Sequence, residues 1–343
     1  TMQHHRKGII STMDSFKPPR ALRNRHVQSI AASIKLRRPF VKRRAAAMLR
    51  KSVETTVDGG DGVRLQGFHS AHGDGPRDLA ILLHGWEGSS DSVYLLSLGG
   101  FLFDRGYDVF RLNLRDHGDS HHLNRGLFNS CRLDEVLAAV KNIRNSYAQD
   151  RNVFLCGFSL GGNFALRVAA KAPSAGVDLA RVIAVCPVLH PPSTLAVLEK
   201  SRILYSPYFI RKWRKSLLKK QALFPDTYDF KDPSVFRNLT VMTDYFVDRY
   251  TEYSDLKTYL NGYSLTGDRL ENLTVPAHIL ISMDDPVIPH TDLTRIARPP
   301  ALSVTLTRFG GHCGFIQNLS MKSWVNEKIA EWMSPHSMPP SEP

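Results

Sequence analysis

Hydrophobic residues in this chain fall into short runs that alternate with longer amphipathic stretches from about Ser52 onward. The short runs are rich in Val, Ile, Leu and Phe and are bounded by turn-forming residues, a pattern typical of β-strands. Eight of these runs are expected to be strands: 52–57, 63–68, 78–84, 107–114, 152–158, 181–188, 277–283 and 302–309. The middle runs are continuously apolar rather than alternating, which indicates strands buried on both faces.

Between the predicted strands, apolar residues recur at intervals of three and four, as they do in helices that pack one face on a sheet. Helices are expected at 91–106, 130–148, 159–172 and 320–333. The first two strands flank a Gly-Gly-Asp-Gly turn at 59–62, which favours an opening hairpin. The alternation of strands and helices predicts an α/β fold with a mostly parallel, eight-stranded sheet flanked by helices.

One interval departs from this alternation of strands and helices. Nearly ninety residues separate the strand that ends near Val188 from the strand that begins near Ala277, and they contain helical patches and aromatic residues. Bare loops of this length are uncommon inside compact domains, so the interval predicts an inserted helical cap. We therefore expect five segments: a basic N-terminal leader packing on the core (1–51), the first part of the core (52–190), the cap (191–272), the second part of the core (273–333) and a disordered tail (334–343).

The positive charge of the chain is concentrated in the leader, residues 1–51. The 343 residues include 45 Lys and Arg against 32 Asp and Glu, a formal charge of +13. The leader holds fourteen of the basic residues and one acid, Asp14; subtracting these from the totals leaves 31 of each sign in the rest of the chain. No helix-turn-helix, zinc-finger or RNP pattern accompanies the charge, so no nucleic-acid partner is expected.

Two basic clusters are interleaved with apolar residues, one at 35–51 in the leader and one at 210–220 in the cap. Such clusters suit an anionic membrane surface, at about 1 kcal/mol per basic residue, but they also occur on ordinary solvated faces, and both interpretations stay open. The longest apolar runs are far shorter than the roughly 18 residues of a membrane-spanning helix. The four cysteines are widely spaced, which favours a reducing cytoplasm. We expect a cytoplasmic protein, with peripheral membrane contact as the open alternative.

The clearest chemical signal is Gly157-Phe158-Ser159-Leu160-Gly161, at the junction of a predicted buried strand and a predicted helix. In this context a G-x-S-x-G pattern places a serine nucleophile on a sharp turn, where flanking side chains would collide with the neighbouring strand and helix. The helix N-terminus presents free N–H groups to developing negative charge. The N–H of Leu160 is the expected first donor of an oxyanion hole.

A serine hydroxyl needs a base and an orienting carboxylate, expected in the order serine, acid, histidine. His312 lies in a glycine-flanked loop after the last predicted strand and is the expected base. His290, the nearest competitor, directly follows the acid loop. Of two adjacent acids after the strand 277–283, Asp285 is the expected partner of the histidine, whereas Asp284 is expected to bind backbone N–H groups.

The second oxyanion donor is expected from His84-Gly85-Trp86, at the end of the strand 78–84. The N–H of Trp86 is the candidate donor, and His84 is expected to brace the loop. The histidine-rich loop at 115–122 matches no metal-ligand spacing and is interpreted as a loop at the rim of the pocket. We expect no metal and no organic cofactor, and the substrate-binding residues stay unassigned.

These residues resemble the α/β-hydrolase superfamily and, within it, the YheT-like family. The resemblance rests on the segments 84–92, 157–163, 284–286 and 310–315, and on a leader segment, Phe16-Lys17-Pro18-Pro19 followed by residues 22–30. It implies an α/β-hydrolase fold and a charge-relay triad of Ser159, Asp285 and His312. Because a removable presequence should not carry a family motif, residues from about 16 onward are expected to belong to the mature protein.

The resemblance also implies carboxylic-ester hydrolysis, on lipid esters in some relatives. We expect a serine hydrolase that cleaves small-molecule or lipid esters with an apolar acyl part, its pocket shaped by cap aromatics. These are Tyr205, Tyr208, Phe209, Trp213, Phe224 and Tyr245. Two alternatives stay open. One is an acyltransferase or thioesterase on the same triad, and the other is an inactive hydrolase scaffold that binds an anionic membrane surface.

Overall fold

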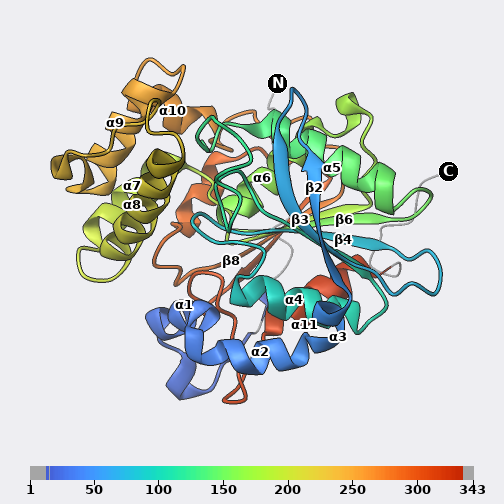
Figure 1. The fold of residues 1–343 in the computed structure, drawn as a ribbon. Helices are drawn as coiled ribbons and strands as arrows, with labels where there is room; N and C mark the ends of the chain where they lie inside the picture. Colours follow the sequence, from blue (N-terminus) through green and yellow to red (C-terminus); the bar gives the residue numbers. More distant parts are fainter. Residues whose placement is uncertain (1–12, 15, 335–343) are drawn as a thin grey trace, which may run out of the picture.

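The fold is built on one twisted β-sheet that runs through the centre of the molecule (Figure 1). The structure, a computed structural model, describes residues 13–14 and 16–334. The sheet has nine strands in the order β1-β9-β8-β7-β6-β4-β5-β3-β2. The strands are β1 (Met13–Asp14), β2 (Ser52–Asp58), β3 (Arg64–Ser70), β4 (Leu79–Leu83), β5 (Asp108–Leu112), β6 (Val153–Phe158), β7 (Arg181–Val185), β8 (Ala277–Ser282) and β9 (Leu302–Thr307).

The eight predicted strands are all present, and the prediction of a mostly parallel sheet is confirmed. The strands β4 to β9 and the short β1 pair in parallel, while β3 pairs antiparallel with both β2 and β5. Every residue of β4, β5, β6, β7 and β8 is buried, as continuous apolar runs predict. The strand β1, contributed by the leader, adds a ninth member beside β9.

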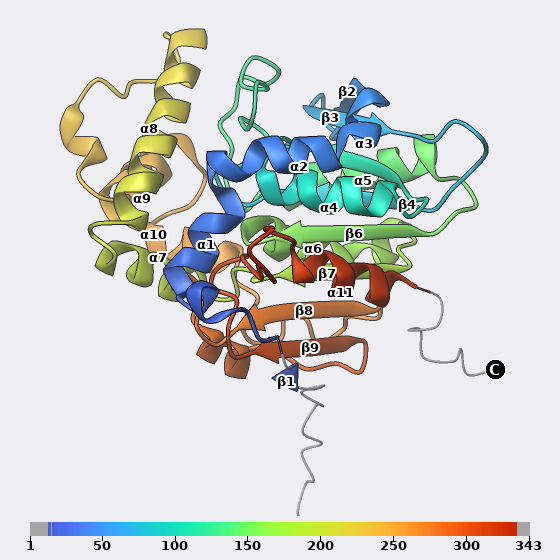
Figure 2. The ribbon, with the colours of Figure 1, turned by 90° about the horizontal axis from the view of Figure 1, so that it is seen from below.

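Helices cover both faces of the sheet (Figure 2). The helices are α1 (Arg25–Ser33), α2 (Arg38–Arg44), α3 (Ala46–Arg50), α4 (Val93–Phe103), α5 (Leu133–Tyr147), α6 (Leu160–Lys171), α7 (Pro191–Lys200), α8 (Tyr205–Leu223), α9 (Leu239–Tyr250), α10 (Leu256–Gly262) and α11 (Trp324–Met333). Short 3-10 helices are η1 (Arg20–Leu22), η2 (Lys35–Arg37), η3 (Pro173–Ala175), η4 (Pro233–Phe236) and η5 (His290–Arg295). All four predicted core helices, now α4, α5, α6 and α11, are present.

The alternation of side chains along β4 assigns these helices to two layers. Leu79, Ile81 and Leu83 belong to a core shared with α5 and α6. Ala80 and Leu82 belong to a second core, which contains residues of α4 and α11. Because successive strand residues point to opposite faces, one strand contributes to both layers.

The described part of the leader packs against α4 rather than extending into solvent. Val41, Ala45 and Met48 are buried in the same core as α4. A side chain at Gly100 would approach the backbone of Ala45 within 2.7 Å, so glycine permits this close contact between the leader and α4. Leader residues 1–12 and 15 lie outside the described residues.

The long interval between β7 and β8 forms the helices α7, α8, α9 and α10, which lie together at one end of the sheet (Figure 1). Asparagine and aspartate begin two of these helices: Asn238 accepts from the N–H of Val241, and Asp255 accepts from the N–H of Thr258. The predicted disordered tail, apart from Ser334, lies outside the described residues. Among the described helices, none is both long and apolar enough to cross a membrane.

Candidate active site

Ser159 lies at the sharp turn between β6 and α6, with a left-handed backbone (φ 53°, ψ −119°). Such a conformation is strained for a residue with a side chain, and it needs support from its surroundings. A Cβ atom at Gly157 would collide with the backbone of Gly161, and one at Gly161 would collide with the carbonyl of His84. The two glycines are therefore required for the strand, the serine and the helix to come this close.

A chain of hydrogen bonds connects Ser159 to His312 and Asp285. The hydroxyl of Ser159 lies 3.0 Å from Nε2 of His312, and Nδ1 of the same ring lies 2.9 Å from Oδ2 of Asp285. With Nδ1–H donating to the carboxylate, Nε2 can accept the serine proton. The structure brings these three predicted residues together although 153 residues separate the serine from the histidine.

The turn after β8 fixes the carboxylate of Asp285. Its Oδ1 accepts from the N–H groups of Val287 and Ile288, at 2.8 and 2.9 Å, which leaves Oδ2 for the histidine. The neighbouring Asp284 accepts from the N–H of Gly311 at 2.9 Å. One acid therefore binds the imidazole, while the other joins the acid loop to the histidine loop.

Two opposing effects act on the pKa of His312. Burial alone would lower it, but the charge of Asp285 and its hydrogen bond to the ring, with a further contribution from Cys186, raise it above the ordinary imidazole value. The carboxylate therefore stabilises the imidazolium, the form that the ring takes after it accepts a proton.

Cys186 and Cys313 lie directly behind the histidine. Their sulfur atoms and a ring nitrogen of His312 lie within 4.8 Å of one another, a grouping that could hold a metal ion. Both ring nitrogens of His312 already have partners in Ser159 and Asp285. Burial also raises the pKa of the Cys186 thiol well above its usual range, which disfavours the thiolate that a metal needs. The group is better explained as packing around the hydrogen-bonded chain.

The loop after β4 lies against Ser159. A Cβ atom at Gly85 would lie 3.1 Å from Cβ of Ser159, so the glycine permits this approach. His84 braces the loop, as expected: its Nδ1–H donates to the carbonyl of Gly85 at 2.8 Å, and its Nε2 accepts from the N–H of Leu114. The candidate donor Trp86 follows directly, and the other candidate, Leu160, is the first residue of α6.

Two of the aromatic residues expected to line a pocket contact the indole of Trp86. The ring of Phe209 stacks on the indole, with 5.1 Å between the ring centroids. The ring of Trp213 packs edge-on against the indole, with 5.3 Å between the centroids. Tyr245 instead packs with Phe230 and Tyr250. The N-terminal half of α8 therefore supplies the apolar surface over the candidate oxyanion loop.

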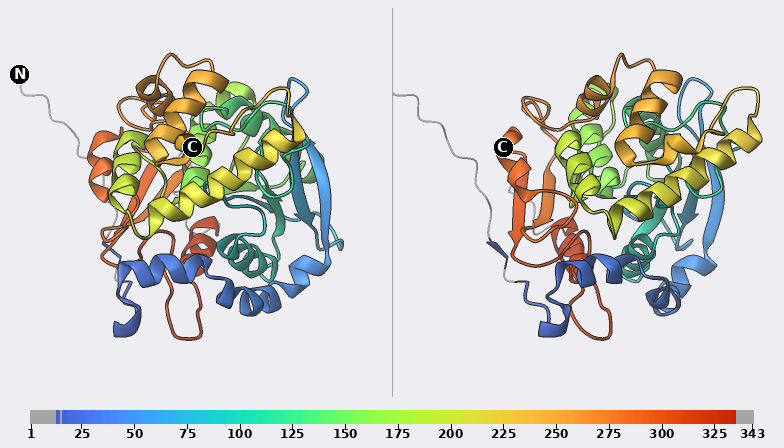
Figure 3. Two further views of the ribbon diagram at one scale, coloured as in Figure 1. Left: turned by 60° about the vertical axis from the view of Figure 1, so that its left-hand side comes forward. Right: turned by 90° about the vertical axis from the view of Figure 1, so that its left-hand side faces the viewer.

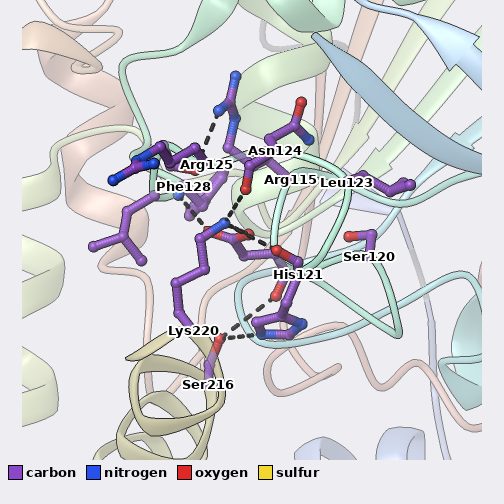
Figure 4. A network of polar contacts seen from close by, with 12 residues as sticks. Arg115, Ser120, His121, Leu123, Asn124, Arg125, Phe128, Ser216 and Lys220 are labelled. Carbon is purple, nitrogen blue, oxygen red and sulfur yellow. Dashed lines mark hydrogen bonds and ion pairs between the residues drawn. The ribbon is translucent and has the colours of Figure 1, made fainter. Parts of the chain in front are cut away.

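The histidine-rich loop at 115–122 uses its side chains for protein contacts. Nε2 of His117 accepts from the N–H of Glu87, and Nε2 of His121 lies 2.9 Å from the hydroxyl of Ser216. Figure 4 shows Lys220 of α8 reaching into the same loop, where its Nζ donates to the carbonyls of His121 and Asn124. The loop therefore joins the core to the cap.

A buried ion pair completes this connection. Nζ of Lys220 lies 2.7 Å from Oδ1 of Asp116, and the two side chains are 0% and 3% exposed. The other carboxylate oxygen of Asp116 accepts from the N–H of Phe128. The sequence-based interpretation of Lys219 and Lys220 as one surface cluster is thus wrong for Lys220, because its three acceptors compensate for burial.

Residues that hold the His312 loop come from the leader helix α1, and the sequence alone did not indicate this role. Ser29 accepts from the N–H of His312 at 2.8 Å. The side chain of Gln28, which is fully buried, accepts from the N–H of Ile316 and donates to its carbonyl. The available signal for this role was the presence of two polar residues, Gln28 and Ser29, on the face of α1 that is buried.

The fit between α1 and this loop is tight. A Cβ atom at Gly314 would approach the carbonyl of Gln28 within 2.6 Å, and one at Gly311 would collide with the carbonyl of Arg25. Gly311 also has a positive φ of 55°, which favours glycine. The leader is therefore part of the structure that positions His312.

Replacing Ser29 with alanine is expected to lower kcat for a soluble ester about tenfold with little change in KM. The reason is that the His312 backbone loses a hydrogen bond worth about 1–2 kcal/mol, which weakens the alignment of its ring with Ser159. Steady-state kinetics would measure this effect. Ser174→Ala, which removes an exposed hydroxyl bond to the carbonyl of Lys171, is the matched control and should leave both constants unchanged. Equal kinetics in the two variants would refute the positioning role.

The chain resembles known proteins in its sequence. A model of the alpha/beta hydrolase family matches residues 80–319. The candidate esterase YheT of Escherichia coli (strain K12) is 23% identical over 333 residues, covering 94% of each chain. The human phospholipase ABHD3 is 21% identical over 300 residues, covering 83% of this chain and 71% of the phospholipase.

Among solved structures, the esterase Pf2001 of Pyrococcus furiosus superimposes with a TM-score of 0.55 and 17% identity. The match covers 82% of this chain and 89% of the esterase. At this level of identity the likeness concerns the fold.

Proposed function

Because the chain belongs to the alpha/beta hydrolase family, we propose that it is a serine hydrolase that cleaves carboxylic esters with an apolar acyl part. The observation that carries the proposal is the hydrogen-bonded chain from Ser159 through His312 to Asp285. Each member of the chain has the partner that a nucleophile, a general base and an orienting acid require.

In the proposed reaction, the Ser159 hydroxyl attacks the ester carbonyl while Nε2 of His312 takes its proton. The N–H groups of Trp86 and Leu160 stabilise the negative charge that develops on the carbonyl oxygen. The protonated imidazole then gives its proton to the leaving alcohol, and an acyl-enzyme remains on Ser159. Water, activated by the same histidine, releases the acid and restores the serine.

Two observations support an apolar acyl group. Phe209 and Trp213 pack on the indole of Trp86, beside the loop that carries the candidate oxyanion donor. Apolar pocket walls favour burial of hydrocarbon, by about 0.8 kcal/mol for each CH₂ group. Among the relatives, the human protein is named as a phospholipase, which is consistent with a lipid-like ester.

A panel of nitrophenyl esters from acetate to palmitate tests this proposal. We expect kcat/KM to rise at least tenfold from acetate to a medium-length chain, because added methylene groups gain contact with the aromatic wall. Product analysis with added alcohol acceptors would distinguish hydrolysis from acyl transfer. Activity that is highest on acetate would contradict the apolar acyl site, and no activity on any ester would contradict ester hydrolysis.

A further inference from the structure

The leader helix α1 has an unusual distribution of side chains for a surface helix. Two of its polar residues, Gln28 and Ser29, are 0% and 7% exposed, whereas two of its apolar residues, Val27 and Ile30, are 40% and 41% exposed. Three of its other residues follow the ordinary pattern, since Arg25 is exposed while Ala31 and Ala32 are buried. A helix that only covers the core would present polar residues to water. The outer face of α1 is therefore an apolar surface without a core function.

Two further apolar residues of the leader are exposed. Leu36 and Phe40 are 77% and 64% exposed, the second on α2. Three exposed cations follow Phe40 in the sequence: Lys42, Arg43 and Arg44. No acidic residue occurs between Phe16 and Lys51 in the sequence. The charged residues of this sequence segment are therefore all basic, and one of them, Arg38, is paired in the fold with Asp91 at 2.6 Å.

The cap presents a second segment of this kind, at the N-terminal end of α8. Ile203 is 95% exposed and the adjacent Leu204 is 37% exposed. Arg202, Arg211 and Lys212 are exposed beside them. No acid occurs from residue 200 to residue 225.

The two segments meet in the fold although they are far apart in the sequence. Nδ1 of His26, in the first turn of α1, lies 3.0 Å from the hydroxyl of Tyr205, the first residue of α8. Figure 3 shows the blue leader running below the yellow α8 in both views. We call the joined surface the docking face; its exposed apolar members are Val27, Ile30, Leu36, Phe40, Ile203 and Leu204.

A cationic groove of about 920 Å³ opens beside the docking face on the cap. Its lining includes five basic residues: Lys200, Arg202, Arg211, Arg214 and Arg237. The one acid in the lining, Glu199, is already bound, since its carboxylate accepts from the N–H and the hydroxyl of Thr240. The groove therefore has the charge to hold anionic phosphate or carboxylate groups.

We propose that the docking face binds the surface of an anionic membrane, with the exposed apolar residues in the interfacial layer and the cationic groove on lipid headgroups. Apolar residues mixed with cations fit such an interface, because burial of hydrocarbon and attraction to anionic headgroups act together. A purely polyanionic partner would use the cations but leave Ile203 and Phe40 without contact.

This inference rests on the proposed function, because docking on a membrane would bring a lipid ester to the hydrolase site. The inner face of α1 binds the backbone of His312 through Ser29, while its outer face belongs to the docking face. Because a helix is about 10 Å across, docking places the catalytic histidine within about one helix diameter of the membrane surface. A lipid ester could then reach Ser159 without crossing bulk water.

Co-sedimentation of the full chain with vesicles tests the proposal. Phosphatidylcholine vesicles with and without 30% phosphatidylserine are the probes, each at low and high salt. We expect at least tenfold stronger binding to the anionic vesicles, weakened by salt. Phe40→Asp and Ile203→Asp should each reduce this binding at least tenfold. Val53→Asp, at a 66% exposed site on the edge strand β2, is the matched control and should bind like the unmodified protein.

Weak binding to both vesicle types would overturn the proposal. So would binding that Arg211→Gln abolishes while Phe40→Asp and Ile203→Asp leave it intact, since that result indicates a soluble polyanion as the ligand. Hydrolysis of a soluble short-chain ester by the unmodified protein reports separately on the proposed function. If the unmodified protein binds anionic vesicles as expected but hydrolyses no ester, the result counts against the proposed function and leaves the docking face supported.

Discussion

We expect replacement of Ser159 by alanine to lower kcat for a soluble nitrophenyl ester by about 10⁴- to 10⁶-fold. The reason is that the Ser159 hydroxyl is the group 3.0 Å from Nε2 of His312, so its removal eliminates the covalent route. Residual turnover would come from the oxyanion donors and substrate binding alone. Stopped or continuous spectrophotometric assays with purified protein would measure the loss.

Two controls make this result interpretable. His312→Ala should cause a loss of similar size, and the double variant should be little worse than either single variant, because the residues act as one unit. Circular dichroism should show an unchanged fold for Ser159→Ala, since a hydroxyl is the one group removed. An activity above about a tenth of the original in folded Ser159→Ala would exclude this serine as the nucleophile.

The second large effect concerns stability. Lys220→Met is expected to lower the free energy of unfolding by about 3–5 kcal/mol, because the carboxylate of Asp116 would remain buried without its cation. Burial already raises the pKa of Asp116, and Lys220 opposes that shift. The backbone carbonyls of His121 and Asn124 would also lose their donor. Urea denaturation would measure the change.

Lys219 offers a neighbouring control. It forms an ion pair with Asp119 at 3.2 Å, but its side chain is 41% exposed and that of Asp119 is 94% exposed. Lys219→Met should therefore change the free energy of unfolding by less than about 1 kcal/mol. A similar small change for Lys220→Met would show that the pair does not hold the cap to the core.

Much of the fold follows from local patterns. Mostly apolar runs identify β4 to β8, because burial on both faces leaves few polar positions, such as Asp108 and Arg111 in β5. The strand β1 could not be predicted in this way, because its two residues, Met13 and Asp14, are too few to show a hydrophobic periodicity. They form a strand by pairing with β9. Cap helices were expected as a group, but their ends depend on individual capping residues such as Asn238 and Asp255.

The candidate active site also contains some residues that could be predicted from the sequence and others that could not. Ser159, Asp285 and His312 could be predicted because each follows a strand at one edge of a parallel sheet, where such ends meet. The roles of Gln28 and Ser29 could not, because they depend on how α1 packs against a loop about 280 residues away. Burial of Lys220 was missed for a similar reason: its partner Asp116 lies 104 residues earlier.

The most direct test of the central claim is covalent labelling with a fluorophosphonate, followed by mass spectrometry of the digested protein. We expect one modified site, Ser159, with labelling slowed strongly in His312→Ala, because the hydroxyl then lacks its base. Ser159→Ala should take up no label. Modification of a different residue, or no modification of folded protein, would contradict the assignment of Ser159 as the nucleophile.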